Sequence, residues 1–199
     1  MDQAVIGPAE DPLVLFDTWY RDAAGQERLP DAMTLATVTE AVRPSARMVL
    51  LKSYGADGFV FYTNTLSRKG REIESHPYAA LCLYWKSTNR QIRVEGRLTP
   101  VTAAEADAYF ASRARESQLA AWASLQSETL PQRATLVERY RSAEGRYSGG
   151  PVPRPPHWSG YRLTPDSIEF WQDVPNRLHD RMLFERGGAG AWQTRRLYP

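Results

Sequence analysis

The sequence predicts an α+β protein, mainly β, built on an antiparallel β-barrel with flanking helices. Short runs rich in β-forming residues fill residues 33–98 and return after residue 160. Most of these runs are joined by short, turn-rich segments, which favour antiparallel strands over a parallel sheet. At 199 residues the chain is long enough for one substantial core and short for two. We therefore expect a single domain over residues 1–199.

Capping and turn signals define the first elements. Residues 1–10 mix glycine, proline and acidic residues without periodicity, and we expect a flexible N-terminal segment there. Asp11 and Pro12 are typical of an N-cap and a first helical position, so a helix begins at this point. A short helix is predicted over residues 67–75, between two strands. The five strands predicted in this half are Met33 to Thr39, Ala46 to Ser53, Phe59 to Thr63, Ala79 to Trp85 and Arg90 to Leu98.

A helical insert is predicted after these strands. Thr102 and Glu105 have the spacing of a capping box, which opens a helix running to Arg113 or beyond. Pro131 opens another helix, which runs to about Tyr147. The proline-rich segment that follows is interpreted as a stiff connecting loop, with a proline-rich partner ligand as the alternative. Strands then resume at Gly160 to Leu163, Ser167 to Gln172, Arg181 to Arg186 and Ala191 to Leu197, with a hairpin turn over residues 187–190.

Bulk composition excludes several classes of protein. The 25 Lys and Arg residues nearly balance the 23 Asp and Glu residues, so no overall basic field recruits nucleic acid or an anionic membrane. Stacking of single-stranded nucleic acid on Tyr84 and Trp85 is disfavoured for the same reason. Cys82 is the single cysteine and is interpreted as a buried, inert thiol, which fits a reducing cytoplasm.

Targeting and metal signals are weak. The N-terminal residues lack a basic start followed by an apolar core, and we expect no secretory signal. No apolar run approaches the length of a membrane span. His76, His157 and His179 are scattered, without ligand spacing or a cysteine partner, so we expect no metal site.

Two upstream segments gather cations. Arg47 and Lys52 would lie on opposite faces of one strand, which a pair of anions would explain. Ser67 is a predicted N-cap, and Arg68 and Lys69 follow in the first helical turn, where the helix dipole disfavours cations unless an anion binds the free amides. A phosphate site is the functional interpretation, and a solvated basic turn is the alternative.

A third cationic segment lies near the end of the chain. If residues 176–181 are extended, Arg177, His179 and Arg181 share one face, with an imidazole between two cations. Such a face is suited to an anion. A solvated edge strand decorated with charge is the alternative.

Polar residues at helical spacing mark the helical insert. Tyr109, Arg113 and Ser117 are four residues apart, so each advances only about 40° around a helix. If the helix continues, the three form one stripe that can hydrogen-bond a phosphate dianion. An exposed polar face is the alternative, and the pair Gln126 and Ser127 is uninformative alone.

Together, these segments resemble the pyridoxine (pyridoxamine) 5'-phosphate oxidase family, flavoproteins with an FMN-binding split-barrel fold. The resemblance covers residues 11–199, and the order and combination of its motifs are specific although each motif alone is weak. Its carriers are Arg47 to Lys52, Tyr62 to Asn64, Ser67 to Lys69, Arg90 and Gln91, Tyr109 to Arg113, Ser117 and Gln118, Gln126 and Ser127, Phe170 to Gln172, and Asn176 to Arg181.

The resemblance implies a homodimer with FMN bound at the interface. The residues it implies for FMN are Arg47, Met48, Val49, Leu50, Leu51, Lys52, Tyr62, Thr63, Arg68, Lys69, Gln91, Gln126, Ser127, Trp171 and Arg181. It implies that the substrate phosphate binds Lys52, Tyr109, Arg113 and Ser117, and that Arg177, Leu178 and His179 lie beside the pyridine.

The implied reaction oxidises pyridoxine 5'-phosphate or pyridoxamine 5'-phosphate to pyridoxal 5'-phosphate, in vitamin B6 biosynthesis and salvage. Hydride passes from the substrate C4' carbon to FMN, and O2 reoxidises the flavin and yields hydrogen peroxide. Arg177 and His179 are the implied catalytic pair. A base role falls to His179 or to water, because Arg177 stays cationic.

Two rival functions stay open. The first is a split-barrel flavin oxidase acting on another small ring, such as a phenazine precursor, although an unphosphorylated substrate would leave the basic residues unmatched. The second is a non-catalytic carrier of flavin or pyridoxal phosphate. The sequence also departs from the family pattern, without loss of a phosphate ligand, at Ala114, Ala120, Asp173 and Tyr198. Asp173 either weakens anion binding through like charge or faces solvent, and we expect the latter.

Overall fold

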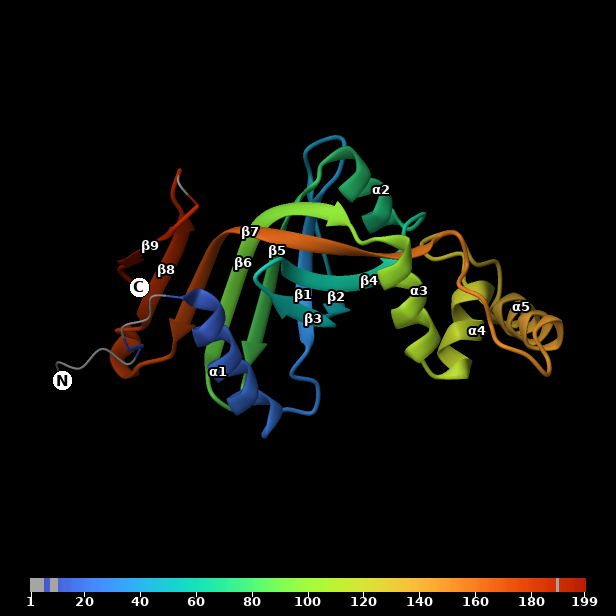
Figure 1. Ribbon diagram of the computed structural model, residues 1–199, viewed down its shortest axis with the longest axis horizontal. Helices are drawn as coiled ribbons and strands as arrows, with labels where there is room; N and C mark the ends of the chain where they lie inside the picture. The colour runs from blue at the N-terminus through green and yellow to red at the C-terminus, as the bar shows by residue number, and fades with distance from the viewer. Residues whose placement is uncertain (1–5, 8–10, 189) are drawn as a thin grey trace.

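A computed structural model describes residues 6–7, 11–188 and 190–199. Its centre is an antiparallel sheet in which nine strands are assigned among the described residues, and five α-helices flank it (Figure 1). The main path of paired strands runs β2-β1-β5-β6-β7-β4-β3, and β8 and β9 extend the sheet from β7. The predicted antiparallel barrel with flanking helices is therefore confirmed.

The strand order explains how the sheet curls. Consecutive strands β2 (Pro44–Leu50) and β3 (Ser53–Gly55) lie at opposite ends of the main path. Since only two residues join them, the sheet must curve until its edges approach, and the Lys52 amide donates to the Val60 carbonyl at 2.8 Å. The other strands are β1 (Ala32–Val38), β4 (Gly58–Asn64), β5 (Tyr78–Trp85), β6 (Arg90–Pro100), β7 (Trp158–Gln172), β8 (Asp180–Arg186) and β9 (Trp192–Arg196).

The predicted caps start three of the helices. Asp11 caps the first helix through the Leu13 amide at 2.8 Å, and Ser67 caps the second. The third opens on the predicted capping box of Thr102 and Glu105. The helices are α1 (Pro12–Ala24), α2 (Arg68–Ser75), α3 (Ala103–Ser112), α4 (Arg115–Ala123) and α5 (Arg133–Arg146).

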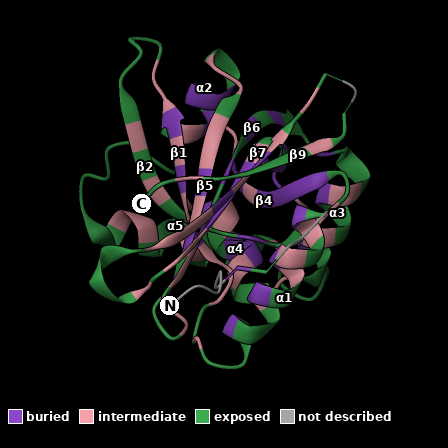
Figure 2. Cartoon of the chain, turned by 90° about the vertical axis from the view of Figure 1, so that its left-hand side faces the viewer, coloured by how far each residue is buried: buried purple, intermediate pink, exposed green. Residues whose placement is uncertain are grey.

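Aromatic side chains fill the barrel and attach α1 to it. Phe16 of α1 packs edge-on against Phe59 and Trp85, with ring centroids 5.0 and 6.4 Å away. All three side chains are buried, and buried residues follow the central strands in Figure 2. At the other end, α3, α4 and α5 project beyond the barrel (Figure 1) and share a smaller core around Phe110 and Trp158.

Three predicted boundaries are wrong. The strand predicted over residues 46–53 is divided into β2 and β3, with the chain crossing between the sheet edges. The two strands predicted over residues 160–172 form one strand, β7, because Pro165 lies at a β-bulge opposite Glu95 and Gly96, where a missing amide is tolerated. The last insert helix begins at Arg133 rather than Pro131.

The predicted flexible segment at residues 1–10 falls mostly outside the described residues. Ile6, which is described, is only 1% exposed. Its amide donates to Asp180 Oδ2 at 2.8 Å, and its carbonyl accepts from Arg196 at 2.6 Å. Two hydrogen bonds to its backbone therefore hold residue 6 against the β8–β9 hairpin.

In the described part of the chain, no helix combines the length and apolarity that crossing a membrane requires.

Candidate functional site

A cavity of about 660 Å³ lies where the barrel meets the helical insert. We call it the insert cavity. It takes its walls from β2, the β2–β3 link, β4, the start of α2, and α3 and α4. Its lining residues are Met48, Val49, Leu50, Lys52, Tyr62, Thr63, Asn64, Lys69, Tyr109, Arg113, Ala114, Ser117, Ala120, Ala121, Ser124, Gln126 and Trp158.

Three stacked rings form one wall of the insert cavity. Tyr62 stacks on Tyr109, with ring centroids 4.1 Å apart, and on Trp158, at 5.2 Å, while the Tyr109 and Trp158 centroids are 6.1 Å apart. The ring planes are within 19° of parallel, so the wall is flat. Gly160 makes this packing possible, because a Cβ there would lie 2.7 Å from the Tyr62 ring. The glycine on β7 therefore sets the position of the wall.

Arg113 is a cation without a carboxylate partner within 4 Å among the described residues. Its guanidinium carbon lies 4.8 Å from the centre of the Trp158 ring. One terminal nitrogen, Nη1, is buried and has no hydrogen-bond partner. Burial lowers the pKa of Arg113 from its usual value. An unsatisfied buried donor is costly, so this side chain is suited to an incoming anion.

Lys69 is a second cation without a carboxylate within 4 Å in the described ranges. Its ammonium donates to Gln126 Oε1 at 2.8 Å and to Thr63 Oγ1 at 3.2 Å. Burial, and secondarily the nearby Arg47, lowers the pKa of Lys69. The side chain thus gathers neutral oxygens from β4 and from the segment after α4, which leaves its charge available to a ligand.

Lys52 differs from these two cations because it is paired. Its ammonium lies 2.7 Å from Asp31 Oδ2, on the link before β1. The expectation that Arg47 and Lys52 occupy opposite faces of one strand is wrong, since Lys52 follows β2. Lys52 lines the insert cavity, whereas Arg47 does not.

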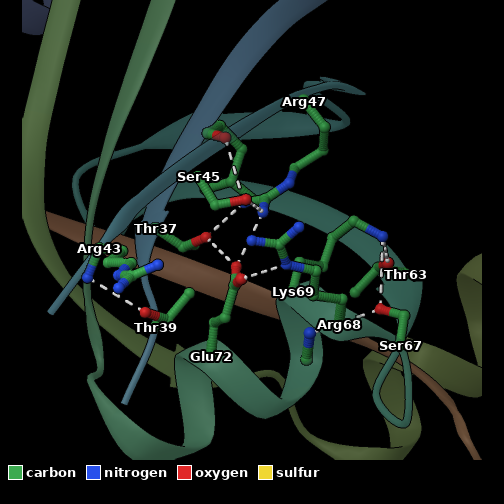
Figure 3. A network of polar contacts seen from close by, with 12 residues as sticks. Thr37, Thr39, Arg43, Ser45, Arg47, Thr63, Ser67, Arg68, Lys69 and Glu72 are labelled. Atoms are coloured by element: carbon green, nitrogen blue, oxygen red, sulfur yellow. Dashed lines mark hydrogen bonds and ion pairs between the residues drawn. The ribbon is translucent and has the colours of Figure 1, made fainter. Parts of the chain in front are cut away.

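Arg47 and Arg68 both bind a buried carboxylate (Figure 3). Glu72 is 5% exposed and accepts from Arg47 Nη2 and from Arg68 Nε, each at 2.8 Å. Burial alone would raise the pKa of Glu72, but hydrogen bonds from Thr37, Arg68 and Arg47 hold it below its ordinary value. Lys69 extends away from Glu72, toward Thr63, so α2 separates one free cation from two neutralised ones.

Most of the remaining predicted residues lie at the other end of the sheet. Gln91 on β6 pairs in register with Trp171 on β7, which pairs with Arg181 on β8. The Trp171 and His179 rings have centroids 4.7 Å apart. We call these four residues the β8 cluster. None of them lines the insert cavity, and Figure 1 shows β8 far from α3 and α4.

The predicted common face of Arg177, His179 and Arg181 is wrong. Pro175–Arg177 form a 3-10 turn, and Asn176 and Arg177 both have φ of 61°, so the segment is not extended. Arg181 is held instead by Glu169 Oε1 at 2.8 Å, and that hydrogen bond raises the pKa of Arg181. Arg177 and Leu178 are exposed.

The predicted stripe on one helix is also wrong, although its residues do meet. α3 ends at Ser112 and α4 begins at Arg115, with Arg113 in extended backbone between them. The break turns Tyr109, Arg113 and Ser117 toward the same cavity from two helices. Among the other predicted residues, Leu51 is buried in the barrel core, and Ser127 is exposed with φ of 77°.

Some residues of the site carried little sequence signal. Trp158 lines the insert cavity, yet no motif spacing marks it. Asn64 also lines the cavity and belongs to the motif Tyr62 to Asn64, but the resemblance implied no role for it. Glu72 follows Arg68 by four residues, a spacing typical of a helical ion pair, and could have been found. Asp173, expected to face solvent, is exposed, with 48% of its side chain accessible, and its Oδ1 also lies 3.0 Å from His179 Nδ1.

Two family models match the chain. The model described as pyridoxamine 5'-phosphate oxidase matches residues 23–146. The model described as the pyridoxine 5'-phosphate oxidase C-terminal dimerisation region matches residues 158–199. The first covers every lining residue of the insert cavity except Trp158, and the second covers Trp158 and the β8 cluster except Gln91.

Named relatives agree with these matches. A pyridoxine/pyridoxamine 5'-phosphate oxidase of Caulobacter vibrioides is 56% identical over 191 residues, covering 96% of this chain and 86% of the relative. The crystal structure of PhzG from Burkholderia lata 383, in complex with tetrahydrophenazine-1-carboxylic acid, superposes with a TM-score of 0.91 at 35% identity, covering 96% and 94% of the two chains. A pyridoxamine 5'-phosphate oxidase-related, FMN binding protein of Nostoc punctiforme shares the fold, with a TM-score of 0.77 at 18% identity, covering 98% and 100%.

Proposed function

The chain belongs to the pyridoxine/pyridoxamine 5'-phosphate oxidase family, and from this we propose that it oxidises pyridoxine 5'-phosphate and pyridoxamine 5'-phosphate to pyridoxal 5'-phosphate. It is an FMN-dependent oxidoreductase that uses O2 and produces hydrogen peroxide, with ammonia as a further product from the amine. The observation that carries the proposal is Arg113, which lines a cavity with the chemistry of a phosphate site and also has a buried donor without a partner.

The residues present fit FMN. Lys69 has a free charge beside the Thr63 hydroxyl and the Gln126 amide, a donor set suited to a phosphate. The apolar edge of β2 offers a surface for a flat ring. The residues proposed to hold FMN are Arg47, Met48, Val49, Leu50, Leu51, Lys52, Tyr62, Thr63, Arg68, Lys69, Gln91, Gln126, Ser127, Trp171 and Arg181.

FMN, when bound, supplies the two-electron chemistry, namely acceptance of hydride from the substrate C4' carbon and reoxidation by O2. The chain's own residues bind and orient the substrate. Arg113 engages the substrate phosphate with Lys52, Tyr109 and Ser117, which face the same cavity. Leu178 contacts the pyridine.

Arg177 and His179 are proposed to act beside the pyridine ring. Arg177 stays cationic and orients the ring, and His179 accepts the proton released when C4' is oxidised. Orientation of this kind accounts for a large part of a rate enhancement, because it removes the entropy cost of bringing the reactants together.

The active form is proposed to be a homodimer with FMN at the interface. Within one chain, the insert cavity and the β8 cluster belong to opposite ends of the sheet. A substrate phosphate at Arg113 therefore needs a second chain to supply Arg177 and His179. The match of residues 158–199 to a dimerisation region supports this arrangement.

We further propose a cytoplasmic location, which suits the single half-buried thiol.

The test is to mix FMN-loaded protein anaerobically with pyridoxine 5'-phosphate and to follow flavin absorbance before and after oxygen is admitted. We expect bleaching, then recovery with formation of pyridoxal 5'-phosphate. Flavin that stays tightly bound and unbleached would contradict the proposal and favour a carrier. Bleaching by tetrahydrophenazine-1-carboxylic acid, the compound bound in the PhzG structure, in place of the phosphate ester would favour an oxidase that acts on that other ring.

A further inference from the structure

In the turn between β7 and β8, the imidazole of His179 contacts the residues that begin the turn. His179 closes this turn, with its side chain 22% exposed and its ring 4.7 Å from that of Trp171. Asn176 and Arg177 adopt left-handed backbone, which costs free energy for residues other than glycine. The contacts that His179 makes with residues 173 and 174 help to offset this cost.

Two groups compete for one ring nitrogen of His179. Asp173 Oδ1 lies 3.0 Å from Nδ1, and the Val174 amide points its N–H at the same nitrogen from 3.3 Å. A carboxylate requires a proton on Nδ1, whereas an amide donor requires a bare lone pair there. The two contacts cannot both be hydrogen bonds in one tautomer. Whichever group forms the hydrogen bond to Nδ1 therefore determines which nitrogen of the neutral ring carries the proton.

The carboxylate is the stronger partner. A hydrogen bond to an ionised acceptor is about twice as strong as one between neutral groups, and the shorter contact is the one to Asp173. If Nδ1 were bare, its lone pair would face a negative oxygen at 3.0 Å. Asp173 is also the one carboxylate within 4 Å of His179 in the part of the chain that the structure describes.

We propose that Asp173 is a positioning residue that holds neutral His179 as the Nδ1–H tautomer, so that Nε2 is left with a free lone pair. The inference rests on the proposed function, in which His179 faces the substrate. Nε2 then accepts the proton that the 4' hydroxyl or amine loses as C4' is oxidised, while the electron pair of the C4'–H bond goes to bound FMN. Without Asp173, the Val174 amide favours a bare Nδ1, and Nε2 becomes a donor.

The direct test is a nitrogen-15 correlation spectrum of the FMN-loaded protein, recorded where the imidazoles are neutral. The chain has three histidines, and His179→Gln identifies the signal of interest. We expect Nδ1–H for His179 in the wild-type protein and Nε2–H in Asp173→Ala. His157 is an internal reference, because its Nε2 lies 3.2 Å from the Ala121 carbonyl and must carry a proton there.

Steady-state kinetics test the consequence for the reaction. Asp173→Ala should lower kcat by about 10-fold or more, since a positioned base contributes at least that much, with KM within about 3-fold because the phosphate contacts are untouched. FMN content should be unchanged. Asp173→Glu should restore Nδ1–H and part of kcat. Asp57→Ala, at an exposed aspartate in the β3–β4 turn, is the matched control and should leave both readouts at wild-type values.

Each outcome bears on the inference. An unchanged His179 tautomer in Asp173→Ala overturns it, and so does a changed tautomer with unchanged kcat. If Asp173→Ala disturbs the His157 reference, Asp173→Glu alone decides, and Nε2–H in that variant overturns the proposal. A tautomer change in a protein that oxidises no pyridoxine phosphate would uphold the role of Asp173 and contradict the proposed function instead.

Discussion

At the scale of single residues, the site separates cations that have a carboxylate from cations that have none. Arg47 and Arg68 are neutralised by Glu72, and Lys52 by Asp31. Arg113 forms no ion pair within 4 Å in the described chain and retains a buried donor without a partner. Leaving this donor unpaired costs free energy, which a bound anion would recover.

Arg113→Gln should weaken substrate binding selectively. A hydrogen bond to a charged group contributes about 1.5–3 kcal/mol, so we expect KM for pyridoxine 5'-phosphate to rise by about 10-fold or more, with FMN still bound. Arg113→Lys should recover only part of this loss, because an ammonium cannot engage two oxygens in the planar fork. Steady-state kinetics and flavin content measure both effects.

Arg141→Gln is the control for Arg113→Gln. Arg141 is exposed on α5, so its loss removes the same charge from the molecule without touching the insert cavity. Equal KM increases in the two variants would show that net charge, rather than the contact made by Arg113, governs substrate affinity.

Glu72→Gln should destabilise the protein and lower FMN affinity. The amide cannot neutralise Arg47 and Arg68, and leaving a buried hydrogen-bonding group poorly matched costs about 2 kcal/mol. Glu74→Gln, on the exposed side of the same helix, is the matched control. Thermal unfolding and flavin titration measure the two effects, and similar losses in both variants would contradict a special role for Glu72.

The effect of Glu72 should depend on pH in a defined direction. The pKa of this carboxyl is lowered in the folded protein from an ordinary value of 4.5. Its ionised form therefore contributes stability that is fully present above pH 4.5 and is lost as the pH falls through the lowered folded value. The stability difference between wild type and Glu72→Gln should shrink on acidification. A difference that grows there would contradict the assigned shift.

The sequence predicted the cationic residues of the site better than it predicted the carboxylates that contact the site residues. Lys69 and Arg113 could be found because cations in a first helical turn, or at helical spacing with a phenol and a hydroxyl, point to an anion. Asp31 and Asp173 could not, since each meets its partner through a turn or link whose path depends on the tertiary fold. Period-two reasoning failed at residues 176–181 because two left-handed residues interrupt the extended backbone.

At the scale of elements, the cap of α3 stabilises the wall of the insert cavity that is proposed to bind the substrate phosphate. Thr102 Oγ1 accepts from the Glu105 amide at 3.2 Å. The helix then carries Tyr109 and ends at Ser112, one residue before Arg113. Thr102→Ala should cost about 1 kcal/mol and lower Tm by about 2–4 °C for a chain of this size. Thr102→Ser, which retains the hydroxyl, should preserve Tm. Calorimetry that finds the two variants equal would contradict the capping role.

Helix starts were predictable here because caps are local. Asp11, Ser67 and Thr102 each place an oxygen where the first free amides need one. The break between α3 and α4 was not predictable, since no glycine or proline occurs at Arg113 or Ala114 and Ala114 makes no side-chain cap. Packing of the insert against β7 must favour this break, which local propensity would not produce.

At the scale of the whole molecule, the proposed homodimer makes a test by mixing possible. Arg113→Ala and His179→Ala should each lose most of their activity when assayed alone at a substrate concentration well below the wild-type KM. If Arg113 of one chain acts with His179 of the other, mixed dimers contain one intact site, and random reassociation should restore about a quarter of wild-type activity. Mixing after mild dissociation, followed by assay and by mass analysis of the dimers, measures the recovery.

The control for this mixing experiment pairs two variants of the same group. Arg113→Ala and Lys52→Ala both alter the insert cavity, but in the proposed arrangement they act within one chain. A mixed dimer of these two has a defect in each site and should stay inactive. No recovery in the first pair despite mixed dimers, or equal recovery in both pairs, would contradict a site shared between chains.

The antiparallel barrel was predictable from short strands and turns, because each strand pairs mostly with near neighbours in the sequence. The separation of the insert cavity from the β8 cluster was not, since a motif list has no spatial order. Only the strand path, with β2 and β3 at its two ends and β8 branching from β7, shows that most of the predicted site residues form two groups.

The contact of Ile6 with β8 has a practical consequence for anyone handling this protein. Asp180, which receives the Ile6 amide, is the immediate neighbour of His179. If a protease used to remove a purification tag cuts after residue 6, Asp180 would lose its hydrogen bond from the Ile6 amide, and the hairpin beside His179 would be held less firmly. Preparations trimmed to different extents should therefore differ in specific activity, and intact mass should be checked before their rates are compared.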